Sequence, residues 1–180
     1  MLSIENSLLL VIDIQDKLVK ACKDSENIGR KSSILAAAAK ILEIPTLVSE
    51  QYPKGLGETI PELKNSLAEG SFFVEKTSFS VLKEDGFKEK LASYGRKQII
   101  LCGIEAHICV YQTCLELLES GYDVYVVKDA SYSRNEYEYQ TGLELMRNFG
   151  AKLTCVEMVL FELLKTSKHP DFKSVQALIK

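Results

Sequence analysis

Short apolar runs alternate with helix-like windows along the chain, and this alternation restricts the possible folds more than any other feature. The first run, Leu8 to Ile12, has strand length and no polar residue, which is typical of a strand covered on both faces. A helical window, Ile34 to Leu42, ends before Pro45 and is followed by a second apolar run, Thr46 to Val48. A strand, a helix and another strand in this order predict a βαβ unit with parallel strands.

The same pattern continues to the end of the chain. Further strands are expected at residues 72–74, 99–102, 124–127 and 151–155, and helices at residues 83–94, 107–120, 136–149 and 157–164. Right-handed crossovers place such helices on both faces of a sheet. The sequence therefore predicts an α/β fold, a Rossmann-like six-stranded parallel sheet sandwiched between helices in three α/β/α layers. We expect a single domain over residues 1–180.

Composition and charge disfavour several classes of protein. The chain has 22 Lys and Arg against 25 Asp and Glu, so it lacks the basic excess of a typical nucleic-acid-binding protein. Its longest aliphatic stretch, Ile34 to Ala39, is far shorter than the roughly 18 residues that a membrane-spanning helix needs. We expect a cytoplasmic protein, with neither nucleic acid nor membrane as a partner.

The five cysteines are odd in number and show no CxxC or zinc-ligand spacing, which favours a reducing compartment over a disulfide framework. Free cysteine is among the most buried residue types, so most of the five are expected in the core. Cys114, five residues after Cys109 on the same expected helix, is interpreted as a core residue.

Polar residues at the carboxyl ends of the expected strands are the natural candidates for a site, because ligands bind there in open parallel sheets. Asp13 follows the first strand, Lys76 the third and Cys109 the fourth. A nearby ammonium and a helix N-terminus both favour a thiolate, and a carboxylate can carry the thiol proton. Backbone N–H groups of the turn from Gly103 to Cys109 can bind a developing oxyanion. The alternative is structural: Asp13 caps a helix, Lys76 is solvated and Cys109 packs inside.

Other candidates also have two interpretations. Gln51 can hydrogen-bond a substrate amide and Phe79 can form a pocket wall, or they can be a solvated loop residue and a core residue. His107 is two positions before Cys109, which favours a helix-terminal or interface role over that of a catalytic base. Asp129 follows the fifth strand and can cap the next turn.

Three separated segments resemble the signature blocks of the isochorismatase-like cysteine hydrolases, in the same order: residues 9–15, 74–79 and 101–110. Residues 49–57, Ser-Glu-Gln-Tyr-Pro-Lys-Gly-Leu-Gly, are similar to the branch of isochorismatase-domain-containing proteins. Similarity continues through residues 121–124, 129–134 and 157–164, so the resemblance covers nearly the whole chain.

The resemblance implies a catalytic triad of Asp13, Lys76 and Cys109, in which the cysteine attacks a carbonyl carbon and the aspartate is the base. It also implies a non-proline cis peptide bond at Ile104-Glu105 and oxyanion binding by the backbone N–H groups of Glu105 and Cys109. Family members often form oligomers, so a homo-oligomer is expected. Isochorismatase itself cleaves a vinyl ether and can lack the cysteine, so the presence of Cys109 favours the thiol route.

The resemblance also bears on cofactors. Nicotinamidases in the family bind a metal through an aspartate and two histidines after the second strand, whereas residues 50–58 here contain no histidine. With His107 and His169 as the only histidines, we expect neither a metal nor another cofactor. If a metal were required, Glu50 would be the first ligand to inspect.

Two functions follow. One is a metal-independent cysteine hydrolase acting on an amide, carbamoyl or ester bond of a small molecule through a Cys thioester. The other is a catalytically silent family member that acts as a binding or interaction protein. Asp13→Asn should abolish the base in the first case while leaving the fold closed.

Overall fold

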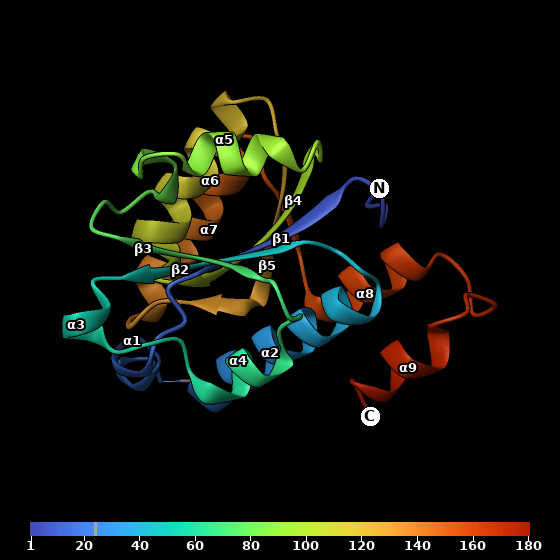
Figure 1. The fold of residues 1–180 in the computed structure, drawn as a ribbon. Coiled ribbons are helices and arrows are strands. Elements are labelled where there is room, and N and C mark those ends of the chain that lie inside the picture. The colour runs from blue at the N-terminus through green and yellow to red at the C-terminus, as the bar shows by residue number, and fades with distance from the viewer. Residues whose placement is uncertain (24) are drawn as a thin grey trace.

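Within residues 1–23 and 25–180, which the computed structural model describes, six strands form one parallel sheet through the centre of the molecule (Figure 1). The strands are β1 (Ser7–Ile12), β2 (Thr46–Gln51), β3 (Phe72–Lys76), β4 (Gln98–Ile104), β5 (Asp123–Tyr132) and β6 (Lys152–Thr154). Their order is β3-β2-β1-β4-β5-β6, and all neighbouring strands are parallel. The predicted α/β fold is therefore confirmed, and the strand order reverses between β1 and β4.

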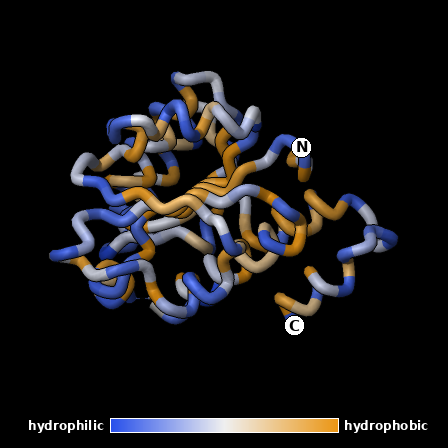
Figure 2. The backbone as a smooth tube through the Cα atoms, in the orientation of Figure 1, coloured by the Kyte–Doolittle hydropathy of each residue, from blue (hydrophilic) through white to orange (hydrophobic). Residues whose placement is uncertain are grey.

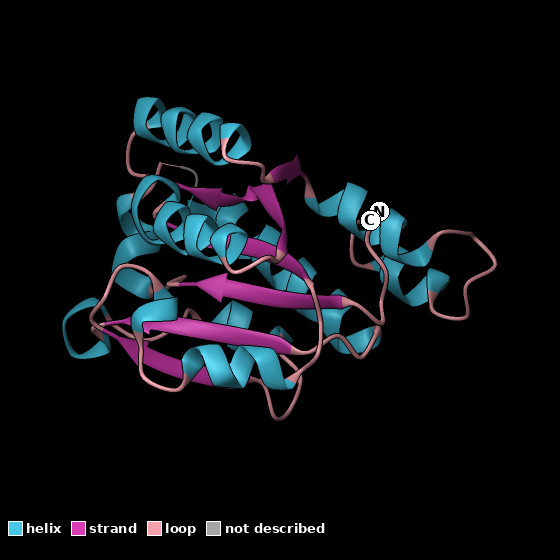
Figure 3. Cartoon of the chain, turned by 90° about the horizontal axis from the view of Figure 1, so that it is seen from above, coloured by secondary structure: helices cyan, strands magenta, loops and turns pink. Residues whose placement is uncertain are grey.

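Helices cover both faces of this sheet (Figures 1 and 3). One face carries α5 (Phe87–Ser93), α6 (Tyr111–Glu119) and α7 (Glu136–Asn148), with the 3₁₀ turn η1 (Val81–Lys83) and the π-helical turn η2 (Ala106–Val110). The other carries α2 (Ser25–Ile41), α4 (Pro61–Ser66), α8 (Val156–Leu164) and α9 (Phe172–Ala177). The short helices α1 (Asp16–Ala21) and α3 (Pro53–Leu56) follow β1 and β2.

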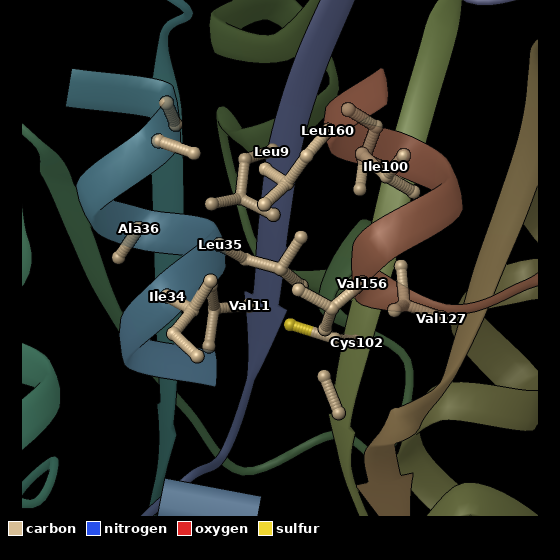
Figure 4. Close-up of a cluster of buried hydrophobic side chains, with 14 of the residues drawn as sticks. Leu9, Val11, Ile34, Leu35, Ala36, Ile100, Cys102, Val127, Val156 and Leu160 are labelled. Carbon is tan, nitrogen blue, oxygen red and sulfur yellow. The ribbon is translucent and has the colours of Figure 1, made fainter. Parts of the chain in front are cut away.

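The continuous apolar runs become strands because each face of the sheet meets its own layer of helices. Leu9 and Val11 of β1 pack on the α2 and α8 side, where Leu35 and Leu160 meet them (Figure 4). Leu10, on the opposite face, joins the core under α5, α6 and α7. Hydrophobic segments therefore concentrate in the central strands in Figure 2. Removing this apolar surface from water, at about 25 cal/mol per Å², stabilises both interfaces.

Strands extend further toward the site than the apolar runs predict. The second, third and fifth strands continue beyond their predicted ends through polar residues, and the fourth continues through Gly103 and Ile104. The expected helix at residues 83–94 is instead η1 followed by α5. The helices α1, α3, α4 and α9 were not predicted, since each has six residues or fewer, too few to establish a helical period.

Gly103 allows β4 to approach β1 at the point where the strand order reverses. Its φ is 143°, and a Cβ atom there would lie 2.1 Å from the backbone oxygen of Ile12. Only glycine fits this position, because any side chain would collide with the backbone of the neighbouring strand. The close approach brings the residues after β1 and β4 together.

Candidate active site

The structure brings Asp13, Lys76 and Cys109 together at the carboxyl edge of the sheet. Asp13 directly follows β1, and Cys109 lies in η2 after β4, so the two flank the reversal in strand order. Lys76 is the last residue of β3, and its side chain crosses the intervening strand β2 to reach Asp13. The three positions expected to form a site therefore do meet, although they come from three different strands.

Asp13 and Lys76 form a fully buried ion pair. Lys76 Nζ lies 2.7 Å from Asp13 Oδ2, and both side chains are 0% exposed. The hydroxyl of Ser49 donates a hydrogen bond of 2.7 Å to the other oxygen, Oδ1. Despite its short distance to Nζ, Oδ2 accepts no hydrogen bond of good geometry from the residues described. The Asp13 carboxylate is thus held at both oxygens, by Ser49 at Oδ1 and by the Lys76 ammonium at Oδ2.

The Lys76 ammonium is surrounded by further oxygen atoms. Its Nζ donates to Gln51 Oε1 at 2.5 Å and to the carbonyl oxygens of Ser78 and Phe79, each at 3.1 Å. Together with Asp13, four acceptors face an ammonium that has three protons. These oxygen atoms hold the buried Nζ of Lys76 in place.

Burial keeps the Cys109 thiol protonated. Burial and then the negative charge of Asp13 raise the pKa of Cys109 to about 12, although Lys76 acts in the opposite direction. The ammonium of Lys76 does favour the thiolate, but desolvation of the anion is the larger effect. Cys102 and Cys114 also have a pKa raised to about 12 by burial, so the pKa does not distinguish Cys109 from these core thiols. Cys109 differs from these core thiols in its contact with a carboxylate, that of Asp13.

The carboxyl group of Asp13 has a raised pKa, chiefly because burial disfavours its charged form. The positive charge of Lys76 opposes this effect and lowers the pKa, as do the Ser49 hydrogen bond and the close polar contacts with Lys76 and Cys109. A raised pKa makes the carboxylate a stronger base than an exposed aspartate. The thiol and its proton acceptor are consequently adjacent in one buried cluster.

The turn that carries Cys109 starts at a cis peptide bond between Ile104 and Glu105. The carbonyl oxygen of Glu105 accepts hydrogen bonds from the N–H groups of Ile108 and Val110. The Glu105 carboxylate, which is 7% exposed, accepts from both Nε and the backbone N–H of Arg134. Oxyanion binding by the N–H groups of Glu105 and Cys109 stays a prediction.

Gln51 and Phe79 both contact Lys76. The Gln51 amide is engaged at both ends, since Oε1 accepts from Lys76 and Nε2 donates to the Thr77 carbonyl at 3.0 Å. Phe79 contributes its carbonyl to Lys76, while its side chain is 54% exposed beside the site. Substrate binding by Gln51 and Phe79 stays a prediction. In the structure, the Gln51 amide binds Lys76 and Thr77.

The remaining candidates have structural partners. His107 Nδ1 lies 2.9 Å from Ser133 Oγ. Asp129 lies within β5 rather than after it, and its Oδ1 accepts from the backbone N–H of Val156, the first residue of α8, so the prediction that it caps the turn after the strand is wrong. Cys114 is fully buried in the core, as interpreted from the sequence.

Glu50 lies on the opposite face of β2 from Ser49 and Gln51, because neighbouring side chains alternate along a strand. Its Oε1 accepts from the N–H and hydroxyl groups of Thr59, both at 2.7 Å. His169, in the C-terminal segment, contacts Asp171. Neither residue joins the cluster around Asp13.

Two residues of the cluster were missed in the sequence. Ser49 precedes Gln51 by two positions, so strand alternation would have placed both on the same face of β2. Gln15 follows Asp13 by two positions, yet no local signal shows that its side chain turns back to bind β2.

A family model described as the isochorismatase domain matches residues 7–158. The relative "Isochorismatase domain-containing protein 2" of Xenopus laevis is 42% identical over 97% of this chain and 83% of its own length. The "Secreted isochorismatase effector Isc1" of Phytophthora sojae is 36% identical over 97% of this chain and 85% of its own length. Such similarity over the full chain agrees with the resemblance of the signature blocks.

Solved structures share this fold. One described as "MAR1 Ribonuclease" from Caenorhabditis elegans superposes with a TM-score of 0.94 and 43% identity, covering 99% of this chain and 91% of its own. YcaC from Pseudomonas aeruginosa, solved with "covalent acrylamide", has a TM-score of 0.92 and 25% identity, covering 99% of this chain and 89% of its own. The Escherichia coli YcaC product, at 24% identity and a TM-score of 0.88 over 98% of this chain and 94% of its own, is described as an octameric hydrolase of unknown specificity.

Proposed function

The chain belongs to the isochorismatase family, and on that premise we propose that it hydrolyses an amide, carbamoyl or ester bond of a small molecule through a thioester on Cys109. One observation carries the proposal. The buried carboxylate of Asp13 contacts both the Lys76 ammonium and the Cys109 thiol at the carboxyl edge of the sheet. A core thiol has no need of a buried ion pair, whereas a nucleophile needs a base.

The first half of the reaction acylates Cys109. Asp13 takes the proton from Sγ as Sγ attacks the substrate carbonyl carbon, and the carbonyl oxygen becomes an oxyanion. The backbone N–H groups of Glu105 and Cys109 bind this oxyanion. Asp13 then gives the proton to the leaving amine or alcohol, the bond to the leaving group breaks, and a thioester remains.

The second half releases the product. Asp13 takes a proton from a water molecule, whose oxygen attacks the thioester carbon. The carbon–sulfur bond breaks, the acid product leaves, and the proton on Asp13 returns to Sγ. Lys76 keeps its charge throughout, so it limits the repulsion between carboxylate and thiolate and fixes the position of Asp13.

We propose that no metal takes part. Among the residues described, no group of three or more His, Cys, Asp or Glu side chains could hold a metal ion. His107 is bound to Ser133, and His169 to Asp171. These contacts leave neither histidine beside Asp13, where a metal would have to act.

The experiment that tests the function is intact-protein mass spectrometry with a library of amides, carbamoyl compounds and esters. We expect an acyl adduct on Cys109 that disappears in Cys109→Ala. Acrylamide serves as a general probe, since Sγ adds to its terminal alkene carbon and a proton is added to the adjacent carbon. An RNA oligonucleotide belongs in the same screen, because one relative is described as a ribonuclease.

Cleavage of RNA without any adduct on Cys109 would contradict the thioester route and the expectation that nucleic acid is not a partner. No turnover and no adduct across the library would favour the alternative, a catalytically silent protein that binds a partner. Both outcomes are distinguishable from the expected one by the mass of the protein and of the products.

We also propose a homo-oligomer, as an octamer is described for one structure with this fold. Large apolar side chains on the surface support this proposal, among them Phe149 at 60% and Met158 at 58% exposed. Sedimentation velocity should show a species heavier than one chain. The described residues contain no helix long and apolar enough to cross a bilayer. A cytoplasmic location stays a proposal, and one relative is named as a secreted effector.

A further inference from the structure

Gln15 has no exposed surface, and among the described residues its side chain binds backbone groups of Gln51, at the end of β2, and of Gly57. Its Oε1 accepts from the N–H of Gln51 at 2.7 Å, and its Nε2 donates to the carbonyl of the same residue at 3.0 Å. Nε2 also donates to the carbonyl of Gly57 at 2.5 Å. One amide thus holds both backbone groups of Gln51 and closes the segment from residue 51 to residue 57.

Gln51 continues this chain of contacts to Lys76. With its backbone held by Gln15, the Gln51 side chain accepts from Lys76 Nζ and donates to the Thr77 carbonyl. Lys76 Nζ then pairs with Asp13. Four groups are connected in sequence: the Gln15 amide, the Gln51 backbone, the Gln51 amide and the Lys76 ammonium.

The strand order explains why such a connection is needed. β3 is separated from β1 by β2, so Lys76 has no backbone contact with the strand that carries Asp13. Its long side chain has many rotamers and must cross β2 to make the ion pair. Gln51, the last residue of β2, lies between the two and meets the ammonium.

We propose that Gln15 and Gln51 are positioning residues that act in series to fix the Lys76 ammonium against Asp13. This inference rests on the proposed function of the Asp13, Lys76 and Cys109 cluster. It also assigns Gln51 to Lys76 rather than to the substrate. Neither glutamine has a contact with Cys109 among those of the described residues, so both act through Lys76.

An amide suits Gln15 because it offers an acceptor and a donor on one planar group. An ionised glutamate at this position would accept from the Gln51 N–H but would turn its second oxygen toward two carbonyl oxygens. A protonated glutamate would regain a donor. We call the series of contacts from Gln15 through Gln51 to Lys76 the relay. In Gln15→Glu, the ionised glutamate should disrupt the relay, and protonation of that glutamate at lower pH should restore part of it.

The test measures the rate of acrylamide addition to Cys109 by intact-protein mass spectrometry, together with melting curves. We expect Gln15→Glu and Gln51→Met each to slow addition at least about tenfold near neutral pH, because small displacements of catalytic groups reduce rates strongly. The addition rate of Gln15→Glu, divided by that of the unmodified protein at the same pH, should rise as the pH is lowered from about 8 to about 5. A purely structural role would change the melting temperature without this change in ratio.

Lys17→Met is the matched control. Lys17 Nζ donates to the Gly55 carbonyl at 2.6 Å, so it binds the same loop from an exposed position without contacting Gln51 or Lys76. We expect its addition rate to stay within about twofold of the unmodified protein. The double variant of Gln15→Glu and Gln51→Met should be no slower than the slower single variant, since residues in series are not additive.

Asp13→Asn separates the two possible failures. If this variant leaves the addition rate unchanged, the proposed function is wrong, and so is the relay, which depends on it. If it slows addition while Gln15→Glu and Gln51→Met stay within about twofold of normal, the relay alone is wrong. If the rate losses of Gln15→Glu and Gln51→Met multiply in the double variant, the relay is also wrong, because the two glutamines would then act independently.

Discussion

At the residue scale, the buried pair of Asp13 and Lys76 makes catalysis and stability depend on the same side chains. Asp13→Asn should reduce turnover or adduct formation at least about a hundredfold, as general base catalysis is lost. It should also lower the free energy of unfolding by about 3 kcal/mol, because Lys76 would be left as a buried charge. The variant is still expected to fold, at this lower stability.

Denaturant unfolding and the adduct assay should be run on Asp13→Asn, Lys76→Met and the double variant. The double variant should lose less stability than the two single variants combined, since it removes both charges. The double variant should still show no turnover and no adduct formation. Normal turnover in a folded Asp13→Asn sample would show that another group is the base.

The raised pKa of Cys109, about 12, predicts that the resting thiol is protonated at neutral pH. Ultraviolet titration of the unmodified protein and Cys109→Ala should show no thiolate difference near pH 7. The rate of adduct formation should fall as acid protonates Asp13, whose folded pKa is raised above the usual carboxyl value. Activity is present above that pKa and lost below it, because only the carboxylate is a base. A thiolate signal from Cys109 already present at neutral pH would contradict this assignment.

At the element scale, the position of Cys109, the proposed nucleophile, depends on how α7 packs against η2. A Cβ atom on Gly142 of α7 would lie 2.9 Å from the Cα atom of His107 and 3.1 Å from its backbone nitrogen. These neighbours are backbone atoms in the turn that carries Cys109, so they cannot move aside alone. The absence of a side chain at Gly142 therefore sets the distance between helix and turn.

Gly142→Ala should lower both the melting temperature and the rate of adduct formation, although alanine favours helices over glycine by about 1 kcal/mol. Glu144→Ala, at an exposed position of the same helix, is the control and should change neither measurement appreciably. An increase in stability with an unchanged adduct rate would mean that α7 can shift without disturbing the turn.

At the scale of the whole molecule, the reversal in strand order places the candidate site between β1 and β4, and β3 contributes from two strands away. Residues 50–58, where the family resemblance implies metal-binding histidines in the metal-dependent branch, contain no histidine in this chain. We therefore expect hydrolysis and adduct formation to survive exhaustive chelation. Activity that is lost on chelation and restored by zinc or iron would contradict the proposed metal-independent reaction.

The sequence alone was sufficient to predict the α/β fold, because continuous apolar runs and helical windows depend on neighbouring residues. It was also sufficient to place Asp13, Lys76 and Cys109 at one edge, since every strand in a parallel sheet ends there. The chemistry of a carboxylate, an ammonium and a thiol then follows from the side chains themselves. The strand ends were harder to predict, because pairing with neighbours extends the strands through polar residues such as Glu50, Glu75 and Lys76.

Only the tertiary structure decided how these three groups are held and in which protonation state. Ser49 binds Asp13 across 36 positions of sequence, and Gln51 binds Lys76 across 25. Such contacts depend on strand order and register, which no local pattern encodes. The same packing removes water from Cys109, and the resulting desolvation outweighs the nearby ammonium and keeps the sulfur protonated.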